Sequence, residues 1–405
     1  MPREFAGAPQ FDDVLRSTAR VLDCIRVGGS ETRQQIGDLV DLGKAVVSER
    51  VRALQAAGVV VEEGQLASGG GRPAKRLRFA AELGYVIAVE VAVTHLRISA
   101  ADLAGVVGWT EHWPYGMSLG PDVVLGELEN RLDDLVHDPQ RRGDGVLCGI
   151  GVGVAAPVEF ATGRVVFPPV HPEWHDQPIR DRLSGRYCVP TWVDNEVNLM
   201  ALAEARHGAA VGQQHALVVK LGSWVGAGLI SDGRLHRGAQ GCAGSMATAA
   251  GGAAIARQAG QLARSGASPA LAAILAAGNE ITAEDVATAA SRGDSACDRL
   301  LQSAAEDVGR VLAVVVDFFN PGLVVVAGGL TEGGDRFLAK LRETLYAGSI
   351  ALATRDLQVV RSRLADQAAT VGAALMTLDM LFALERLEKT LATLHAQAAD
   401  GVAVS

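Results

Sequence analysis

The most constraining feature of the sequence is a pattern of β-strands that occurs twice, about 130 residues apart. Each copy has the alternation and turn residues of three consecutive antiparallel strands. The copies are YVIAVEV, HLRISAADLAG and VVGWT within residues 85–110, and ALVVKLG, VGAGLISDG and RLHRG within residues 216–238. Helical periodicity occupies much of the remainder, at residues 122–137, 198–207, 294–319 and 367–389. The duplication predicts two related α/β lobes with a cleft between them.

A segment of different character precedes the first lobe. Apolar residues at helical spacing predict three short helices, with Ile36 and Leu39 facing inward on the second and Gly58 ending the third. A hairpin at residues 59–79 follows them. This order of elements is that of a winged helix-turn-helix. We therefore expect residues 11–80 to form a DNA-binding domain of this type with a basic arm.

The candidate DNA contacts of this domain come from two stretches. In a helix-turn-helix the start of the second motif helix meets base edges in the major groove, and here that helix begins near residue 44. In the arm, Arg72 stands between glycines and Pro73, and an arginine held in this way can enter a narrow minor groove. Two alternatives do not involve DNA. The helix could expose the ordinary surface of a three-helix bundle, and the arm could be a solvated linker. The candidate DNA-binding residues are Lys44, Ala45, Ser48, Arg52, Arg72, Lys75 and Arg76.

The charge distribution limits where nucleic acid can bind. The formal net charge is −9, but residues 1–80 hold 12 basic and 10 acidic residues, whereas the other 325 hold 25 and 36. Within residues 42–80, seven basic residues accompany three acidic ones. Acidic lobes would be repelled by a phosphate backbone. We expect DNA contact to be confined to the domain and its arm, which excludes sequence-independent coating of nucleic acid.

Cysteine usage and hydropathy indicate the compartment. The five cysteines are far apart and form no Cys-x-x-Cys pair, so neither a disulfide framework nor a thiol-rich zinc site is expected. The N-terminus lacks the apolar segment of a signal peptide. No apolar run approaches the roughly 20 residues that span a bilayer. We expect a cytoplasmic protein with no membrane segment.

Four stretches give the chain a resemblance to a known family. They are GIGVGVAAPVEFATGRVVFPP at 149–169, WVDNEVNLMALAEARHG at 192–208, ISDGRLHRGAQGCAG at 230–244 and VVVAGGL at 324–330. Over residues 11–390 the chain resembles the ROK proteins (repressors, open reading frames and sugar kinases), specifically the repressor branch. The resemblance implies an α/β protein with a winged helix-turn-helix followed by a two-lobed actin-like (ribonuclease H-like) sugar-kinase fold. The lobes would span residues 84–200 and 201–390, with a C-terminal tail at 391–405.

The phosphate-binding motifs of the kinases in this family are altered in the sequence. Where these kinases have Asp-x-Gly-Gly-Thr, this chain has Glu90-Val91-Ala92-Val93-Thr94, so two Cβ groups stand where phosphate oxygens would approach. Where they have Gly-Thr-Gly-x-Gly, it has Gly222-Ser223-Trp224-Val225-Gly226. For the surviving Gly226 and Gly228, a tight β-turn is a better explanation than phosphate binding.

The catalytic and metal-binding motifs are altered too. Glu196 stands at the position of the family's catalytic Asp, and misplacement of a carboxylate by about an ångström can cost on the order of 100-fold in rate. Two roles stay open for Glu196: a hydrogen-bond acceptor for sugar, or a cap for the helix that follows. Ser245-Met246-Ala247-Thr248 replaces Glu-x-Gly-His, and the cysteine-rich zinc knuckle is missing. We therefore expect no catalytic residue, no metal and no cofactor.

The family's sugar-binding cleft suggests where a ligand would bind in this chain. The resemblance implies that the effector-binding residues are Ala156, Glu159, Asn195, Glu196 and Ser245, and that Val170 replaces an Asn of the family's sugar loop. A pocket that loses polar partners loses affinity for sugar hydroxyls. The cleft therefore holds a different ligand from that of the kinases, or none.

The function expected from the sequence is transcriptional regulation, with repression as the expected sign. Its partners would be double-stranded operator DNA, a small-molecule effector of the sugar class, and a second copy or three further copies in a homodimer or homotetramer. One alternative is an ATP-dependent sugar kinase with an accessory DNA-binding domain. Another is a regulator controlled by a protein partner on the lobes.

Overall fold

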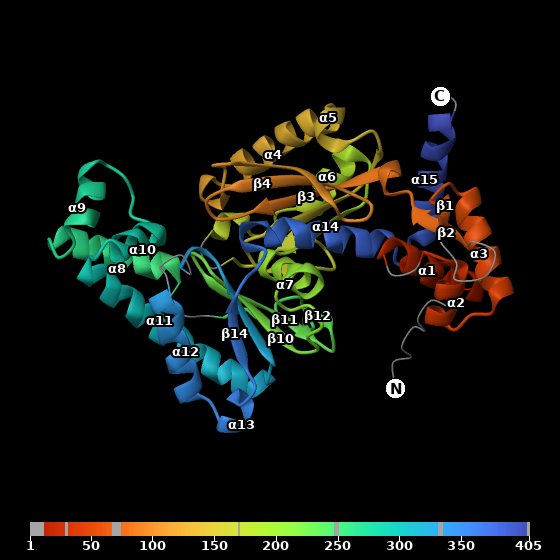
Figure 1. The fold of residues 1–405 in the computed structure, drawn as a ribbon. Helices are drawn as coiled ribbons and strands as arrows, with labels where there is room; N and C mark the ends of the chain where they lie inside the picture. The colour runs from red at the N-terminus through yellow and green to blue at the C-terminus, as the bar shows by residue number, and fades with distance from the viewer. Residues whose placement is uncertain are drawn as a thin grey trace, which may run out of the picture.

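The structure, a computed structural model, describes residues 12–28, 31–66, 74–168, 171–246, 251–330 and 335–402. Figure 1 shows two α/β lobes and a smaller N-terminal domain, here called the head (residues 12–79), beside the first lobe. Both lobes are built on a five-stranded sheet, and the head has the helix and strand order of a winged helix-turn-helix. The fold class predicted from the sequence is confirmed.

The head is built from three helices and a hairpin. These are α1 (Asp13–Arg26), α2 (Arg33–Val40), α3 (Lys44–Ala56), and the antiparallel strands β1 (Val60–Leu66) and β2 (Ala74–Phe79). Thr32 caps α2: its hydroxyl accepts a hydrogen bond from the backbone N–H of Gln35, whose side chain accepts one from the N–H of Thr32. The prediction for Leu39 is wrong, because this side chain is 67% exposed. Val40, four residues after Ile36, occupies the buried stripe instead.

The first lobe contains the first copy of the strand pattern. Its sheet has the order β5-β4-β3-β6-β9, with β3, β4 and β5 antiparallel and with β6 and β9 parallel to β3. Side chains of alternate β3 residues pack on opposite faces of the sheet: Ile87 packs on the side of α4, and Val86 packs on the side of α14. The elements are β3 (Gly84–Val91), β4 (Leu96–Asp102), β5 (Val107–Trp113), α4 (Pro121–Val136), α5 (Pro139–Arg142), β6 (Val146–Val154), β7 (Val158–Glu159), β8 (Arg164–Val165), α6 (Ile179–Tyr187) and β9 (Thr191–Asn195).

The second lobe repeats this sheet. Its strand order is β12-β11-β10-β13-β14, and β10, β11 and β12 form the second antiparallel meander. Leu217 and Val219 of β10 pack on the helices from α8 to α12, while Val218 packs on α7. The elements are β10 (Ala216–Leu221), β11 (Val225–Ser231), β12 (Arg234–His236), α8 (Gly252–Arg264), α9 (Pro269–Ala276), α10 (Ala283–Ser291), α11 (Ser295–Phe319), β13 (Leu323–Ala327), α12 (Asp335–Gly348), α13 (Ala351–Thr354) and β14 (Gln358–Arg361).

One helix, α7 (Glu196–His207), lies between the two sheets, and glycines allow other elements to approach it closely (Figure 1). A Cβ on Gly228 of β11 would lie 2.5 Å from the carbonyl oxygen of Val197, and Gly372 packs directly against the backbone of Leu199. The β-turn predicted for Gly226 and Gly228 is therefore wrong, because both residues lie inside β11. The missing side chain at Gly228 makes room for α7.

The C-terminal part differs from the sequence prediction. Residues 367–389 are not one helix: α14 (Ala368–Leu381) is followed by α15 (Leu387–Val402), so most of the expected tail at 391–405 is helical. α14 packs against β3, β6 and α7, which makes it part of the first lobe rather than the second. This position requires a helix that is apolar on nearly all sides. Leu387 and Leu394 of α15 join the core of the head.

Candidate functional site

A buried cluster of charged side chains lies in the cleft between the lobes. Glu90 comes from the end of β3 in the first lobe, Lys220 from β10 in the second, and Glu196 from the first turn of α7. The Lys220 Nζ lies 2.8 Å from Glu196 Oε2 and 3.7 Å from Glu90 Oε1. Glu90 and Glu196 are 4% and 6% exposed. One ammonium group thus bridges two buried carboxylates that belong to different parts of the cleft.

Two further side chains place nitrogen atoms beside Glu90. His95, in the turn after β3, and Arg97, on β4, place nitrogen atoms 3.5 Å and 3.3 Å from Glu90 Oε2. Arg97 also lies 3.9 Å from Asp366, in the short turn before α14. Together with Lys220 and Glu196, these four side chains border a cavity of about 590 Å³. This network ties the first lobe, α7 and the second lobe together in the cleft.

The pKa values in the cluster move in different directions for the two carboxylates. Burial raises the pKa of Glu90, but His95, Lys220 and Arg97 outweigh it, and the net shift is downward. Burial also raises the pKa of Glu196, the charge of Glu90 adds to the rise, and Lys220 offsets only part of it. For Lys220, the two carboxylates outweigh burial and raise the pKa. At neutral pH, Lys220 is therefore a cation held by an ionised Glu90.

The nucleotide side of the cavity offers no phosphate cradle within the residues that the structure describes. The Trp224 indole, 38% exposed, borders the cavity where the resemblance implies glycine. The N–H groups of Gly252 and Ala253, at the start of α8, already donate to the carbonyl oxygens of Gly222 and Ser223. An acidic side chain, Glu284, packs against the backbone of Gly329 on the same wall. A polyphosphate here would meet carboxylates and occupied N–H groups, which disfavour its binding.

The predicted effector residues do not all gather in one place. Asn195 and Ala156 are in contact, because the Asn195 side-chain amide donates to the Ala156 carbonyl oxygen at 2.7 Å. Ser245 lies beside β11, where it forms a bridge with Gly226. Glu159 is exposed and accepts a hydrogen bond from Thr162 Oγ1. The family-loop position Val170 lies outside the described residues.

The capping role considered for Glu196 belongs to its neighbour. The Asn195 side-chain oxygen accepts a hydrogen bond from the backbone N–H of Val197 at 2.8 Å, so Asn195 is the N-cap of α7. Glu196 is already inside the helix and points its carboxylate at Lys220. Of the two roles left open for Glu196, the capping of the helix is therefore wrong. Asn is one of the best N-cap residues, and this preference could have been read from the sequence.

Sequence reasoning missed a second ion pair beside the cleft. Arg237, just after β12, places its Nε 2.7 Å from the fully buried carboxylate of Asp194, and its guanidinium stacks on the Phe160 ring at 4.1 Å. The other oxygen of Asp194 accepts a hydrogen bond from the Asn198 amide at 2.8 Å. This pair connects the second lobe to the end of β9. Sequence reasoning missed Lys220 as well. The signal that could have found it is a single charged residue in the otherwise apolar strand ALVVKLG.

The recognition-helix candidates lie on one open face of the head. Lys44, Ala45 and Arg52 are exposed on α3, and Ser48 is half-buried between them. The Arg52 Nε donates to the Ser48 carbonyl oxygen at 3.1 Å, which lays the arginine side chain along the helix. Val47 is buried on the opposite face. The structure thus brings these four candidates together.

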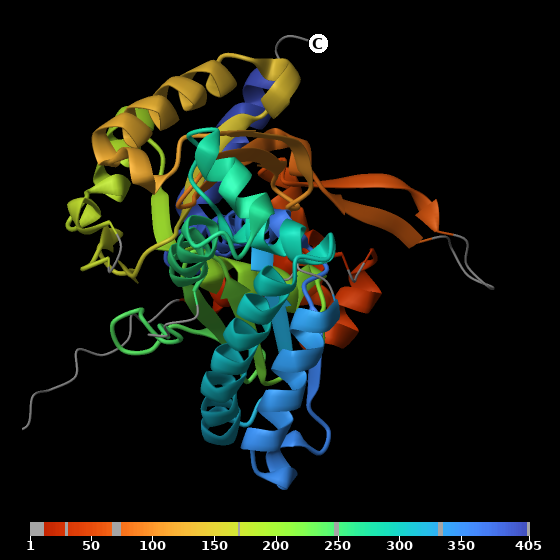
Figure 2. The ribbon, with the colours of Figure 1, turned by 90° about the vertical axis from the view of Figure 1, so that its left-hand side faces the viewer.

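The wing holds its basic side chains in ion pairs with acidic ones. Lys75 on β2 pairs with Glu62 on β1, and Arg76 pairs with Glu31 before α2. Glu62 also accepts from Arg33, and hydrogen bonds from Lys75 and Arg33 lower its pKa to about 2. Figure 2 shows the β1–β2 hairpin projecting from the body of the molecule. Arg72, the candidate for the minor groove, lies outside the described residues.

The described part of the chain contains no group of three or more His, Cys, Asp or Glu side chains placed to hold a metal ion. Within the same residues, no helix is both long and apolar enough to cross a bilayer.

Comparison with known proteins identifies the family. Residues 86–380, which include both lobes, match the model of the ROK family. The chain belongs to the ROK family. The resemblance found from the sequence motifs is confirmed.

Relatives within the ROK family include regulators that match nearly the whole chain. A xylose repressor of Caldicellulosiruptor bescii is 30% identical over 376 residues, which cover 86% of this chain and 92% of the relative. The DNA-binding transcriptional dual regulator NagC of Escherichia coli is 26% identical over 388 residues, 90% and 93% of the two chains. The crystal structure of a ROK family transcriptional regulator, a homolog of the E. coli MLC protein, has a TM-score of 0.78 at 22% identity and covers 94% of this chain and 99% of its own. The fold therefore extends over the head as well as the lobes.

Proposed function

We propose that this protein is a transcriptional repressor that binds operator DNA through the head and responds to a small effector in the cleft. The observation that carries the proposal is the exposed face of α3, with Lys44, Ser48 and Arg52 together on a helix-turn-helix that projects from acidic lobes. Helices presented in this way read the major groove. Similarity to a xylose repressor over 86% of the chain, and to NagC over 90% of it, supports the same function. Action on operator DNA places the protein in the cytoplasm.

The proposed effector is a sugar or a sugar derivative. The similarity to a xylose repressor supports this class. The cavity of the cleft is bordered by polar side chains that suit hydroxyl ligands, among them Thr94, Ser223 and Asp366. A ligand can change DNA binding only if it prefers one arrangement of the lobes over another.

The cleft is proposed to act without catalysis. Glu196, at the position of the family's catalytic base, is bound to Lys220 and has a raised pKa, so a sugar hydroxyl would have to displace an ion pair to reach it. The absence of free N–H groups at the described start of α8 supports the same view.

Self-association is proposed to use an apolar surface on the second lobe. Val314 and Phe318 of α11 are 70% and 91% exposed, and Ile350 and Leu352, around the start of α13, are 59% and 73% exposed. The Ile350 N–H donates to Asp317 on α11, so these side chains share one end of the lobe, which lies at the bottom of Figure 2. An exposed apolar patch of this kind marks an interface. A symmetric dimer would present two heads to the two halves of an operator.

Selection of genomic DNA fragments by the purified protein tests the proposal. We expect enrichment of a small set of sites with two half-sites about one helical turn, or a multiple, apart. The matched control is the Lys44→Ala/Arg52→Ala protein, which should enrich none of them. Equal enrichment by both proteins, or no enrichment by the wild type, would refute DNA recognition by α3.

A thermal-stability screen with D-xylose, N-acetylglucosamine and D-glucose tests the effector class. A sugar present at 100 times its Kd should stabilise the protein by about 2.7 kcal/mol. A screen in which none of the three sugars raises the Tm would contradict these candidates. ATP turnover stimulated by one of them would contradict the absence of catalysis.

A further inference from the structure

The head is docked on the end of one helix of the first lobe. Phe382, directly after α14, is 5% exposed and lies between two elements of the head. Its ring meets Phe79 of β2 edge to face at 5.8 Å between centroids, and the Arg26 guanidinium at the end of α1 lies 4.8 Å from its centroid. Aromatic and cation–π contacts of this kind depend on ring orientation. A shift of α14 therefore moves α1 and the wing together.

The same helix is packed against α7, the helix that begins in the cleft. Gly372 of α14 has no side chain where it meets the backbone of Leu199, so the two helices are in direct backbone contact. At the far end of α7, Arg206 pairs with Asp379 of α14 at 3.0 Å. A 12-residue helix is about 18 Å long, so α7 spans the distance from the cleft cluster to the base of the head.

The cleft end of α7 is where the two lobes meet in one ion cluster. Lys220 belongs to the second lobe and Glu90 to the first, while Glu196 is part of α7. A rotation of one lobe against the other changes the distance from Lys220 to Glu90. Because Glu196 is paired with the same ammonium group, a displacement of Lys220 also displaces the start of α7.

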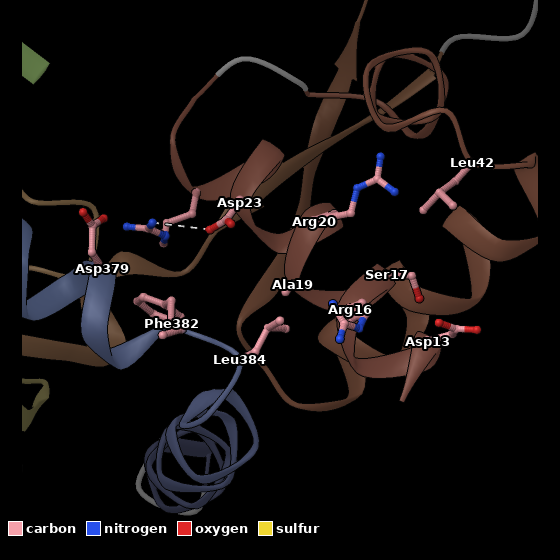
Figure 3. Close-up of a pocket in the computed structure, with 12 residues that line it drawn as sticks. Asp13, Arg16, Ser17, Ala19, Arg20, Asp23, Leu42, Asp379, Phe382 and Leu384 are labelled. Carbon is pink, nitrogen blue, oxygen red and sulfur yellow. Dashed lines mark hydrogen bonds and ion pairs between the residues drawn. The ribbon is translucent and has the colours of Figure 1, made fainter. Parts of the chain in front are cut away.

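Beside this junction the packing leaves room for motion. A cavity of about 650 Å³ lies between α1 and the end of α14. Figure 3 shows Arg16, Arg20 and Asp23 of α1 on one side of it, and Asp379, Phe382 and Leu384 on the other. Beside Phe382, the head and the first lobe are thus separated by an open space rather than by close-packed side chains. Close-packed interfaces resist rotation, and a cavity removes that resistance.

We propose that Phe382 is a positioning residue that passes the state of the cleft, through α7 and α14, to the DNA-reading head. This inference rests on the proposed function, because it names the regulation of that function. The cleft cluster sets the position of α7, α7 carries α14 with it, and Phe382 orients α1 and the wing. By linkage, a change at the head acts back on the cleft with the same coupling free energy.

A double-mutant cycle in the full-length protein tests the coupling. Lys220→Met changes the cleft and Phe382→Leu changes the junction, and hydrogen exchange is measured in α1 and β2. In the wild-type background, Lys220→Met should change exchange in these two elements by about 5-fold or more, the lower end of typical coupling between sites. In the Phe382→Leu background the same change should have no effect there.

The matched control replaces a phenylalanine of equal burial away from the head. Phe337 on α12 is 1% exposed in the core of the second lobe, so Phe337→Leu carries the same loss of packing. The effect of Lys220→Met on α1 and β2 should persist in this background. If Lys220→Met does not fold, Glu196→Gln replaces it in the cycle. The proposal is overturned if the cleft variant changes exchange in the lobes alone, or if its effect on the head is equal in all three backgrounds.

This readout does not depend on DNA, so it separates the inference from the proposed function. Coupling in hydrogen exchange without enrichment of genomic DNA would refute the proposed function alone. Enrichment of DNA by a protein in which the cycle is additive would refute the coupling alone.

Discussion

Lys220 of the second lobe lies 2.8 Å from Glu196, which stands at the start of α7 in the position of the family's catalytic Asp. The ammonium group occupies a place between two carboxylates that would otherwise repel each other. The protein therefore carries its own cation at the centre of the cleft. A side chain in this place links the second lobe to carboxylates of the first lobe and of α7.

Replacement of this cation should make stability strongly dependent on pH. Lys220→Met leaves Glu90 and Glu196 buried beside each other, and removal of one partner of a buried ion pair costs about 3–5 kcal/mol. Like charges raise the pKa of the remaining carboxylates above the ordinary value near 4.5. Stability from such groups is present at low pH and is lost as the pH rises through the raised pKa. Thermal unfolding should therefore show a larger deficit at pH 8 than at pH 5.5.

The control for this experiment is Glu196→Gln, which keeps Lys220 paired with Glu90. Because burial already raises the pKa of Glu196, its loss as a charge should cost much less at neutral pH than the loss of Lys220. A Lys220→Met deficit that is constant across this pH range would contradict the buried carboxylate pair.

The sequence alone predicted the head and the two lobes, but it did not predict which side chains pair with one another in the cleft. The alternation in residues 85–110 and 216–238 predicts both meanders, because strand pattern and turn residues are local. The pairing of Lys220 with Glu90 joins residues 130 positions apart in different lobes, and no local pattern records it. The motif comparison identified Glu90 and Glu196 as altered positions, but it interpreted each only as the loss of a kinase residue. The structure shows that both carboxylates are instead paired with Lys220.

The close packing of α7 predicts a severe effect at one glycine. In Gly228→Ala the new Cβ would lie 2.5 Å from the Val197 carbonyl oxygen and 2.6 Å from the Ala201 Cβ, and neither atom belongs to a flexible side chain. Overpacking of this kind costs about 1–3 kcal/mol. We expect a lower Tm in thermal unfolding. Gly126→Ala is the control, because Gly126 lies within α4 with open space around it and should gain about 0.5–1 kcal/mol. Equal Tm changes in the two variants would refute the packing argument.

The ion pairs of the wing predict that an acidic side chain restrains DNA binding. Glu31 holds Arg76, so Glu31→Gln releases a cation on the projecting hairpin. Binding to mixed-sequence DNA should strengthen, and the slope of log K against log salt should become more negative by up to about 0.9 for one new phosphate contact. Glu343→Gln removes an equal charge beside Lys340 on α12 and should change neither quantity. Titrations by fluorescence anisotropy at several salt concentrations measure both. Unchanged binding by the Glu31 variant would show that Arg76 does not reach DNA.

The exposed face of α3 predicts different roles for two of its residues. Lys44, at the N-terminus of the helix, is placed to contact phosphate, and Lys44→Ala should weaken binding to all sequences and reduce the salt slope by about 0.9. Arg52 lies two turns further along, held against the Ser48 carbonyl oxygen. If it reads a guanine, Arg52→Ala should lower affinity for the selected operator by about 1–3 kcal/mol and leave mixed-sequence binding nearly unchanged.

The control for both variants is Lys389→Ala, which removes the charge of an exposed lysine on α15. A uniform loss in both α3 variants would assign both residues to the phosphate backbone, and base recognition would then belong to Ala45 and Ser48.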